Sequence, residues 1–537
     1  MRFRKKVAIL AALGFMGVAV LGSRTAYAAE KPAYLKSVTY FGDEWPINYW
    51  GSEDNDMAAN FEKIKADGFN SMILVVPWRE FQPADGVQEF NPAAFQRLND
   101  VMTQAEAHGL WVVLRIGYSW DYYGASELPA RFGGLVNDAS ADRALWLRYC
   151  DAIYQAASAH SNFHSGFITW EDFWDYVHNM GRDYDRAKMC ELAASSGYQD
   201  YLSRHYGLDV ISAKYGENFG SYSEIYLPGR QMEAAELFYG FYDQMLNGLL
   251  EQSQTVFPGL SMEVRADGDP VYRNDGSMYY YSHYQTYPCH GAEYSALMYS
   301  VSMGQRNEND RISAGEALAA MDRNLDSLTS ISGKKYYAEQ LLYMDTTEEF
   351  SYNTQVHDEE VDDYVRSLAP VLQKNTMGYG LWVYRNYVNN CVYNGQFGLG
   401  ETGWKFANGS KVENVDGTSM AMLAKNSSIT QELTGRIAGN AAMYVEFDAK
   451  PDFANSVVTV QLGNKVQEVK VTKAGTYKCH FSNMWDPELE ITLSSNKRTY
   501  VDDIRVYTYE QYGRIYDKDG NEQDLADDFR ILNSQLP

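Results

Sequence analysis

Two carboxylic side chains, Glu171 and Glu339, each stand directly after a short apolar or aromatic run of the sequence. Such a run suits the interior of a β-strand, and barrels and open α/β sheets keep their reactive groups where the strands end. Two carboxyl groups about 5 to 5.5 Å apart can cleave a glycosidic bond with retention, one as nucleophile and the other as general acid and then base. The sequence predicts this chemistry, provided that a fold brings the two strand ends together.

The chain between residues 34 and 387 alternates short apolar runs with longer helical stretches, which is typical of βα units and a parallel sheet. Eight such units fit an α/β fold, the (β/α)8 TIM barrel, with the largest insertion after the fourth strand. The expected strands cover residues 37–41, 71–76, 111–116, 166–170, 261–264, 278–282, 335–338 and 379–383.

The ends of these strands offer aromatic, basic and acidic side chains, which suit a polar ligand with apolar faces. The sequence has no Gly-rich phosphate loop and no spacing of metal ligands, so neither a cofactor nor a metal is expected. The predicted substrate-binding residues are Trp78, Arg115, Trp120, Asp172, His283, Tyr284, Tyr287 and Trp382.

Several of these residues have a structural interpretation beside the functional one. Trp382 is either a sugar platform or a packing residue at the top of the barrel. Arg115 needs a carboxylate partner if it points into the barrel. His283 is either a substrate contact or a satisfied structural histidine, and Tyr284 and Tyr287 compete to orient Glu339.

Several segments resemble the clan of (β/α)8 retaining glycoside hydrolases, especially the β-galactosidase-type families 42 and 35. GFNSMILVVPWREFQPADGVQEFN and AEAHGLWVVLRIGYSWDY are similar to the second and third βα units of both families. GYQDYLSRHYGLDVISAKYGENFGSYSEIYLP resembles the helical insertion of family 42. Glu339-Gln340 matches that family's nucleophile strand, and Tyr287-Pro288 resembles its sixth-strand ending. The resemblance implies Glu339 as nucleophile and Glu171 as acid/base.

One position departs from these families, which usually place Asn directly before the acid/base Glu. This chain has Trp170 there, followed by Glu171 and Asp172. Either Glu171 is the acid and Trp170 replaces the Asn, or the register shifts by one and Asp172 is the acid. Glu171 is preferred because its longer side chain reaches the glycosidic oxygen more readily. The departure leaves specificity for a β-galactoside open.

The first 28 residues read as a secretory signal peptide, with a basic start, an apolar run and the small-residue site Ala26-Tyr27-Ala28. Cleavage after Ala28, a secreted protein and no transmembrane helix elsewhere are expected. The chain of 537 residues has a formal charge of -25, and removal of residues 1–28 with their five basic side chains leaves -30. Such a charge repels nucleic acid and anionic membranes.

Five cysteines are spread along the chain without a CxxC pair, which argues against a disulfide scaffold and against a zinc site. One disulfide bridge is possible, and because the number of cysteines is odd at least one thiol must stay unpaired.

After residue 387 short alternating strands replace the helical pattern, which predicts a β-sandwich. Residues from about Gly400 to Tyr509 resemble the jelly-roll carbohydrate-binding modules of secreted glycosidases, in which a final strand of the Tyr-Val-Asp-Asp-Ile type is common. The available aromatic platforms are Trp404, Trp485 and Tyr477, and a structural spacer is the alternative. The expected domains are a signal peptide (1–28), a catalytic barrel (29–395), the sandwich (396–510) and a loose acidic tail (511–537).

The sequence thus predicts a secreted retaining β-glycosidase that acts on an oligo- or polysaccharide. The alternative from another class is a catalytically inactive, secreted carbohydrate-binding protein, which the departure at Trp170 favours.

Overall fold

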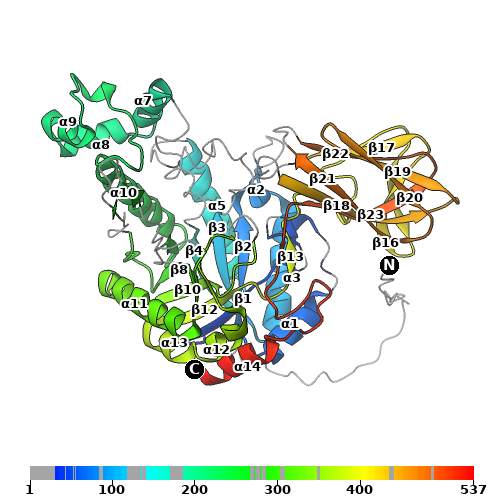
Figure 1. Ribbon diagram of the computed structural model, residues 1–537, viewed down its shortest axis with the longest axis horizontal. Helices are drawn as coiled ribbons and strands as arrows, with labels where there is room; N and C mark the ends of the chain where they lie inside the picture. Colours follow the sequence, from blue (N-terminus) through cyan, green and yellow to red (C-terminus); the bar gives the residue numbers. More distant parts are fainter. Residues whose placement is uncertain are drawn as a thin grey trace.

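A computed structural model gives the structure of the chain (Figure 1). It describes residues 31–42, 44–46, 48–52, 54, 56–83, 89–117, 135, 141–169, 185–265, 271–272, 278–279, 286–302, 309–347, 351–433, 441–484 and 489–537.

Eight parallel strands close into a barrel in the order β1-β12-β10-β8-β5-β4-β3-β2, which confirms the predicted (β/α)8 fold. Their apolar runs explain the closure, since a parallel strand is covered on both faces; every residue of β2, for example, is buried. The strands are β1 (Leu35–Thr39), β2 (Ser71–Pro77), β3 (Trp111–Gly117), β4 (Phe163–Ile168), β5 (Ser261–Arg265), β8 (Ser295–Ser300), β10 (Tyr336–Leu342) and β12 (Thr376–Trp382).

Helices surround the barrel, and local sequence fixes where several of them begin. Asn91 caps α3 by accepting from the backbone N–H of Ala93, with Pro92 in the first turn. Ser313 and Glu316 form a capping box at the start of α11. The surrounding helices are α1 (Met57–Ala66), α2 (Trp78–Phe81), α3 (Pro92–Ala107), α5 (Ala141–Ser158), α10 (Ala235–Gln254), α11 (Ala314–Ser332), α12 (Val361–Arg366) and α13 (Ala369–Asn375).

The described part of the insertion between the fourth and fifth strands includes the short helices α7 (Arg186–Ser195), α8 (Tyr198–His205) and α9 (Leu208–Tyr215). They project beyond the barrel on the side away from the sandwich (Figure 1).

The sixth barrel strand is β8 and not the predicted run at 278–282. β7 (Met278–Tyr279) instead pairs antiparallel with β6 (Val271–Tyr272), and both lie in the connection between β5 and β8. The run in β8 is buried at all its residues, and it alone pairs with β5 on one side and β10 on the other. Both runs are aromatic and strand-like, so the choice between them depends on tertiary pairing and not on propensity.

The predicted β-sandwich is confirmed as two five-stranded antiparallel sheets, ordered β14-β17-β22-β19-β20 and β15-β16-β23-β18-β21. Alternating residues of both sheets, such as Val458, Val460 and Phe447, fill one apolar core between them. The strands are β14 (Lys405–Phe406), β15 (Lys411–Val415), β16 (Thr418–Leu423), β17 (Ser427–Glu432), β18 (Ala441–Pro451), β19 (Ser456–Leu462), β20 (Lys465–Val471), β21 (Gly475–Met484), β22 (Glu490–Ser495) and β23 (Thr499–Tyr507).

The chain leaves the barrel for the sandwich and then returns to it. β13 (Tyr387–Val388), on the way out, pairs antiparallel with β24 (Glu510–Gln511), on the way back. The returning chain also contacts the segment after β10, where Thr347 Oγ1 donates to Gln511 Oε1 (2.5 Å) and the backbone N–H of Tyr512 donates to Thr346 Oγ1 (3.0 Å).

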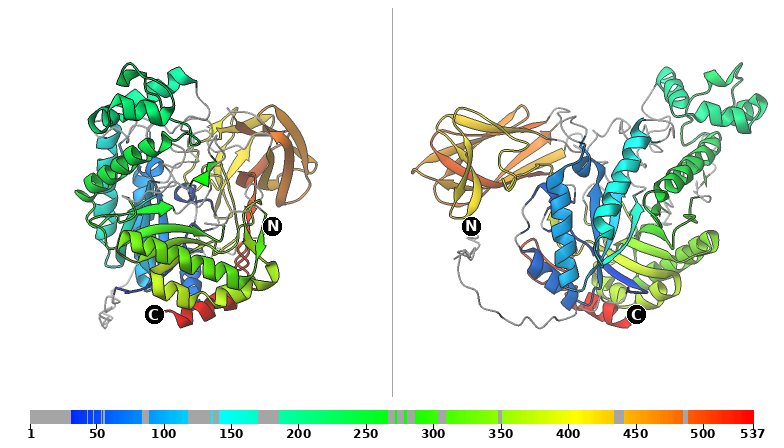
Figure 2. Two further views of the ribbon diagram at one scale, coloured as in Figure 1. Left: turned by 60° about the vertical axis from the view of Figure 1, so that its left-hand side comes forward. Right: turned by 180° about the vertical axis from the view of Figure 1, so that it is seen from behind.

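The loose tail expected after residue 510 is instead a packed element that ends in α14 (Ala526–Gln535). Phe529 and Leu532 lie in the apolar core of the barrel domain. Lys36 Nζ on β1 donates to the carbonyl oxygens of Asn533 (3.1 Å) and Leu536 (3.4 Å). The helix lies below the barrel, at the end opposite the helical insertion (Figures 1 and 2).

Asp67 holds the returning chain against the barrel. Its Oδ2 accepts hydrogen bonds from Tyr384 and from Tyr516, each at 2.8 Å, and its Oδ1 accepts from Arg530 Nε at 2.8 Å.

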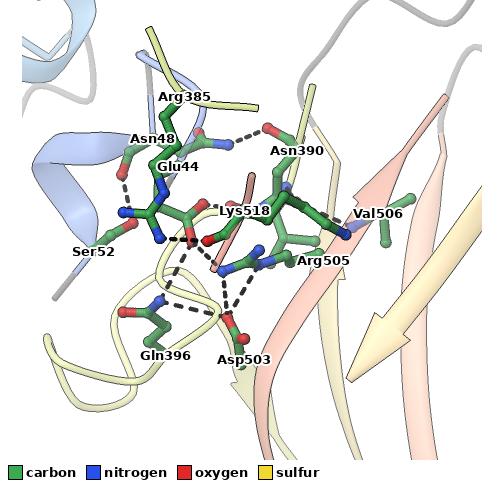
Figure 3. A network of polar contacts seen from close by, with 11 residues as sticks. Glu44, Asn48, Ser52, Arg385, Asn390, Gln396, Asp503, Arg505, Val506 and Lys518 are labelled. Carbon is green, nitrogen blue, oxygen red and sulfur yellow. Dashed lines mark hydrogen bonds and ion pairs between the residues drawn. The ribbon is translucent and has the colours of Figure 1, made fainter. Parts of the chain in front are cut away.

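Figure 3 shows the polar contacts between the barrel and the sandwich. Glu44, in the segment after β1, forms an ion pair with Arg505 of β23, with Oε1 and Nη2 3.4 Å apart. Asn390 Nδ2 donates to Glu44 Oε2 (3.1 Å), and Gln396 Nε2 donates to Glu44 Oε1 (3.4 Å). Arg505 pairs in addition with Asp503 (3.1 Å). One carboxylate of the barrel thus joins two segments of the sandwich domain.

The five cysteines are all free thiols. Within the described part of the chain, no helix is long and apolar enough to cross a membrane.

Candidate active site

Glu339 lies in a β-bulge of β10, the seventh strand of the barrel. In the pairing with β12 the register shifts between Ala338 and Leu341, so that Glu339 and Gln340 together face the single residue Gly380. The pairing with β8 shifts within the same stretch. A bulge re-aims side chains and is common beside active sites. Here it turns two consecutive polar side chains of a buried strand toward the barrel interior, where a regular strand would turn one.

Gly380 makes room for this bulge. A Cβ atom at position 380 would lie 2.2 Å from the carbonyl oxygen of Glu339 and 2.5 Å from Ile73 Cδ1. Neither distance is compatible with ordinary van der Waals contact. The missing side chain therefore lets β12 lie against the bulged backbone that carries Glu339.

Arg115 joins several strands inside the barrel. Its Nη1 donates to Gln340 Oε1 at 2.8 Å, and its Nη2 lies 2.9 Å from Glu263 Oε2. Nη2 also donates to Thr169 Oγ1 (3.1 Å), and Thr169 donates in turn to Glu263 (3.3 Å). Arg115 is 1% exposed and Glu263 is 0% exposed, so the ion pair is desolvated.

The prediction that Arg115 pairs with a carboxylate is confirmed, and that carboxylate is Glu263 of β5. Sequence reasoning did not single out Glu263. The alternation Ser261-Met262-Glu263-Val264 contained a signal, since it puts Glu263 on the same face of a short strand as Ser261. Only closure of the barrel shows that this face points inward.

An aromatic layer forms the floor beneath this network. Tyr337 of β10 donates its hydroxyl to Ser37 Oγ of β1 at 2.7 Å. Its ring makes edge contacts with Tyr294 (centroids 5.4 Å apart) and Phe167 (6.4 Å). Burial raises the pKa values of both tyrosines, which keeps them neutral hydroxyl groups. The floor thus closes the barrel below Glu339.

Trp382 ends β12 and lies in an aromatic cluster. Its ring centroid is 5.7 Å from Phe41, 6.2 Å from Trp45 and 5.6 Å from Tyr387. It is 7% exposed. Trp45 and Tyr387 stack on each other at 5.3 Å. This arrangement satisfies the packing interpretation of Trp382 and leaves only a small part of its surface for a ligand.

Trp78 has a packing role, and the structure does not support its prediction as a substrate contact. Its ring is 1% exposed and stands edge-on to Trp146 of α5 (5.2 Å), and its Nε1 donates to Gln82 Oε1 (2.7 Å). Next to it, Arg79 and Glu80 pair with each other (3.5 Å). Burial raises the pKa of Glu80, and Arg79 opposes that rise.

Tyr287 does not stand at the C-terminal end of the sixth strand, because that strand begins only at Ser295. It is 4% exposed, and its carbonyl oxygen accepts from Ser295 Oγ at 2.5 Å. Tyr287 therefore lies beside the first residue of β8, at the end of the strand opposite to the one where it was predicted.

The remaining predicted site residues lie outside the described residues. They are Glu171, Asp172, Trp120, His283 and Tyr284, together with Trp170. Thr169, two positions before Glu171, is described and is fully buried in the Arg115 network.

The aromatic residues considered as platforms in the sandwich are only partly available. Trp404 is 7% exposed, packs against Phe397 (5.6 Å) and donates from Nε1 to the carbonyl oxygen of Asn394 (3.1 Å). Tyr477 stacks on Phe447 at 6.1 Å. Trp485 lies outside the described residues.

The described residues of the barrel interior therefore offer carboxylates, a guanidinium and an amide in a dry, close-packed setting. Arg115 donates to Gln340 through Nη1 and contacts Glu263 and Thr169 through Nη2, which fixes the orientation of these side chains. Such a site suits chemistry by positioned carboxylates. Among the described residues, no group of three or more His, Cys, Asp or Glu side chains could hold a metal ion.

No family model and no curated protein matches the chain. Solved structures that resemble it include the β-galactosidase of the psychrophilic Marinomonas ef1 (11% identity, 65% of this chain and 54% of that chain, TM-score 0.45). Another is the exo-β-1,4-mannosidase Op5Man5 of Opitutaceae bacterium strain TAV5 (10%, 66% and 53%, 0.41). A third is the β-amylase catalytic domain of Paenibacillus polymyxa (14%, 65% and 92%, 0.41).

The chain spans about half the length of the first two of these proteins. The strand order and pairing of this chain assign the barrel by themselves. The resemblances to solved structures are similarities of fold.

Proposed function

We propose that the protein is a secreted glycoside hydrolase that cleaves O-glycosidic bonds of an oligo- or polysaccharide with retention of configuration. The observation that carries this proposal is the bulge of the seventh strand, which turns Glu339 into the barrel interior next to the amide that Arg115 holds. The resemblance of the sequence to families 42 and 35 supports the same role for Glu339.

In the proposed mechanism the carboxylate of Glu339 attacks the anomeric carbon while Glu171 protonates the departing oxygen. The bond to the leaving group breaks and a glycosyl ester of Glu339 forms. Water then attacks the same carbon, Glu171 takes its proton, and Glu339 leaves as carboxylate. The protons balance, because the acid spent in the first step is restored in the second. Asp172 is the alternative acid/base, and a β-galactoside is one candidate substrate.

A panel of aryl β-glycosides and soluble polysaccharides tests the activity, with the chain from residue 29 as enzyme. Glu339→Ala is expected to fold and to lose hydrolysis. Azide should then restore turnover of an activated aryl glycoside and give the glycosyl azide of inverted configuration, because azide enters the face that Glu339 has left. An unchanged hydrolysis rate in Glu339→Ala would remove Glu339 from the mechanism.

The same experiment decides between the two candidate acids. Azide rescue of the acid/base variant should give the azide of retained configuration, because azide then attacks the glycosyl ester from the opposite face. We expect this product from Glu171→Ala; its appearance with Asp172→Ala instead would move the acid by one residue. If the wild-type protein binds the polysaccharides but cleaves none of the panel, the protein is a carbohydrate-binding protein.

The role of the sandwich is proposed to be that of a spacer fixed to the barrel. The burial of Trp404 in the sandwich core and the contacts of Glu44 with Gln396 and Arg505 of the sandwich domain support this role. We expect the protein to hydrolyse soluble substrates and not to be retained by insoluble polysaccharide in a pull-down.

A further inference from the structure

We propose that Arg115 and Glu263 form a positioning pair that sets the separation between the two strands carrying the catalytic carboxylates. The inference rests on the proposed function, since it assigns a role beside the reacting groups. Neither residue is proposed to touch the substrate or the reacting atoms.

The hydrogen bonds of the pair reach both of these strands. Arg115 of β3 donates through Nη2 to Thr169, two positions before Glu171, and through Nη1 to Gln340, directly after Glu339. Glu263 of β5 binds the same Nη2 at 2.9 Å and accepts from the Thr169 hydroxyl. The fourth and seventh strands are therefore joined across the barrel by side chains of the third and fifth.

The pair lies beside the bulge and above the aromatic floor. In the register of the barrel, Glu263 pairs with Ala296 of β8, and Ala296 pairs with Tyr337 of β10. Because the strands of a barrel tilt relative to its axis, residues related by two such pairings do not lie at one height. The guanidinium of Arg115 contacts Gln340, the second residue of the bulge, directly at 2.8 Å.

The setting gives the network little freedom. Arg115 is 1% exposed, Glu263 and Thr169 are 0% exposed and Gln340 is 8% exposed. In such a low-dielectric interior a broken hydrogen bond leaves an unsatisfied polar group, so the arrangement resists change. The planar fork of Arg serves several acceptors in fixed directions, which the single ammonium of Lys does not reproduce.

The separation of the two carboxyl groups decides the reaction. A gap of about 5 to 5.5 Å allows the double displacement, whereas about 6.5 to 9.5 Å admits a water molecule and inversion. A misplacement of about 1 Å can cost about 100-fold in rate. A network that ties the two strands together beside the bulge is therefore placed to control kcat without contacting the substrate.

Glu263→Gln tests the pair, because it keeps the size of the side chain and removes its charge. We expect kcat on an activated aryl glycoside to fall about 100-fold while KM stays within about twofold. The matched control is Asp528→Asn on α14, outside the site. It removes a buried carboxylate (2% exposed) from its ion pair with Arg366 of α12 (2.5 Å). The control should lose thermal stability and keep kcat.

Thr169→Val is the milder second variant, in case Glu263→Gln does not fold. It keeps the shape and the ion pair and removes only the hydroxyl that links them to the fourth strand, so we expect a fall of about 10-fold in kcat with unchanged KM. Arg115→Lys keeps the charge and loses the fork, and it should not restore full kcat. Folded Glu263→Gln and Thr169→Val proteins with wild-type kcat would overturn the inference.

A failure of the proposed function is recognised separately. If the wild-type protein cleaves no glycoside, crystal structures of the wild-type and Thr169→Val proteins supply the test. We expect the distance between the Cα atoms of residues 169 and 340 to differ by more than about 0.5 Å, the tolerance within which functional groups are held. An unchanged distance would overturn the positioning role whatever the activity.

Discussion

Two buried networks of arginine and carboxylate groups hold this molecule together, one inside the barrel and one between the barrel and the sandwich. Arg115 and Glu263 lie 2.9 Å apart, and their partners stand on or directly after barrel strands. Glu44 and Arg505 lie 3.4 Å apart, and Glu44, Asn390 and Gln396 all stand in connecting segments. Arg505 has a second carboxylate within reach, Asp503.

The difference lies in how far each network tolerates change. Inside the barrel a lost partner leaves a charge with no access to water, so the network is rigid. At the interface the shared carboxylate and the 9% exposure of the Arg505 side chain let the remaining groups rearrange. The same pairing of an arginine with a glutamate therefore fixes the geometry of the barrel interior and, at the interface, holds the sandwich against the barrel.

Arg115→Met should show the largest effect, because it leaves the Glu263 carboxylate buried without its guanidinium. We expect a loss of about 3 to 5 kcal/mol in the free energy of unfolding, measured by urea denaturation. The double variant Arg115→Met with Glu263→Gln should lose less than the sum of the two single variants. A loss below about 1 kcal/mol for the single variant would contradict a rigid, desolvated pair.

Gly380→Ala tests the rigidity of the barrel wall itself. The new methyl group would meet the Glu339 carbonyl oxygen and Ile73 Cδ1 at distances that require movement of the backbone. We expect a loss of about 1 to 3 kcal/mol together with reduced kcat. The matched control, Gly248→Ala in α10, has nothing within 4 Å of the new atom and should be stabilised by about 0.5 to 1 kcal/mol. Equal effects at both positions would show that the bulge has room to adapt.

Acid should lower the stability of the barrel through His164. Burial, aided by Lys31, lowers the pKa of His164 on β4 from 6.5 to about 3. As the pH falls below 6.5, His164 binds a proton in the unfolded chain but stays neutral in the folded chain. The free energy of unfolding therefore falls by about 1.4 kcal/mol per pH unit until about pH 3. At pH 5 the loss from this group is about 2 kcal/mol.

The measurement is urea unfolding of wild-type and His164→Asn proteins at pH 7 and pH 5. The variant should show a smaller difference between the two pH values than the wild-type protein, because it has removed the titrating group. The same pH dependence in both proteins would exclude His164 as its source.

Glu44→Gln should show the smallest effect, about 1 kcal/mol, because Arg505 keeps Asp503 and the amide retains hydrogen bonds to its neighbours. Calorimetry of the whole chain gives the size of the effect, with both domains expected to remain folded. A loss as large as that of Arg115→Met would erase the distinction between the two networks.

The periodicity of the sequence was sufficient for the barrel and the sandwich, because buried parallel strands and alternating sandwich strands leave local patterns. It was not sufficient for the sixth strand. Residues 278–282 and 295–300 have equally strand-like compositions, and only the pairing with β5 and β10 decides between them. Acidic composition likewise concealed the apolar spacing of Phe529 and Leu532, which makes α14 a packed helix.

The candidate site was predictable only where the local sequence marked a residue as unusual. Glu339 followed an aromatic run and Arg115 required a carboxylate, so both could be singled out, although the structure places both within strands and not at their ends. Glu263 could not, because a charged residue in the middle of an alternating strand is equally compatible with a solvent-facing side. Trp78 follows a strand as expected, but the direction of its ring is set by packing against α5, which the local sequence does not reveal.

The position of α14 imposes an order on folding. Lys36, on the first strand, binds the carbonyl oxygen of a residue 497 positions later, and the whole sandwich lies between them in the sequence. A barrel emerging from the ribosome therefore lacks its lower cover until nearly all of the chain has followed. Long loops of this kind make closure slow relative to local pairing. The unclosed barrel would be the species most in need of a chaperone.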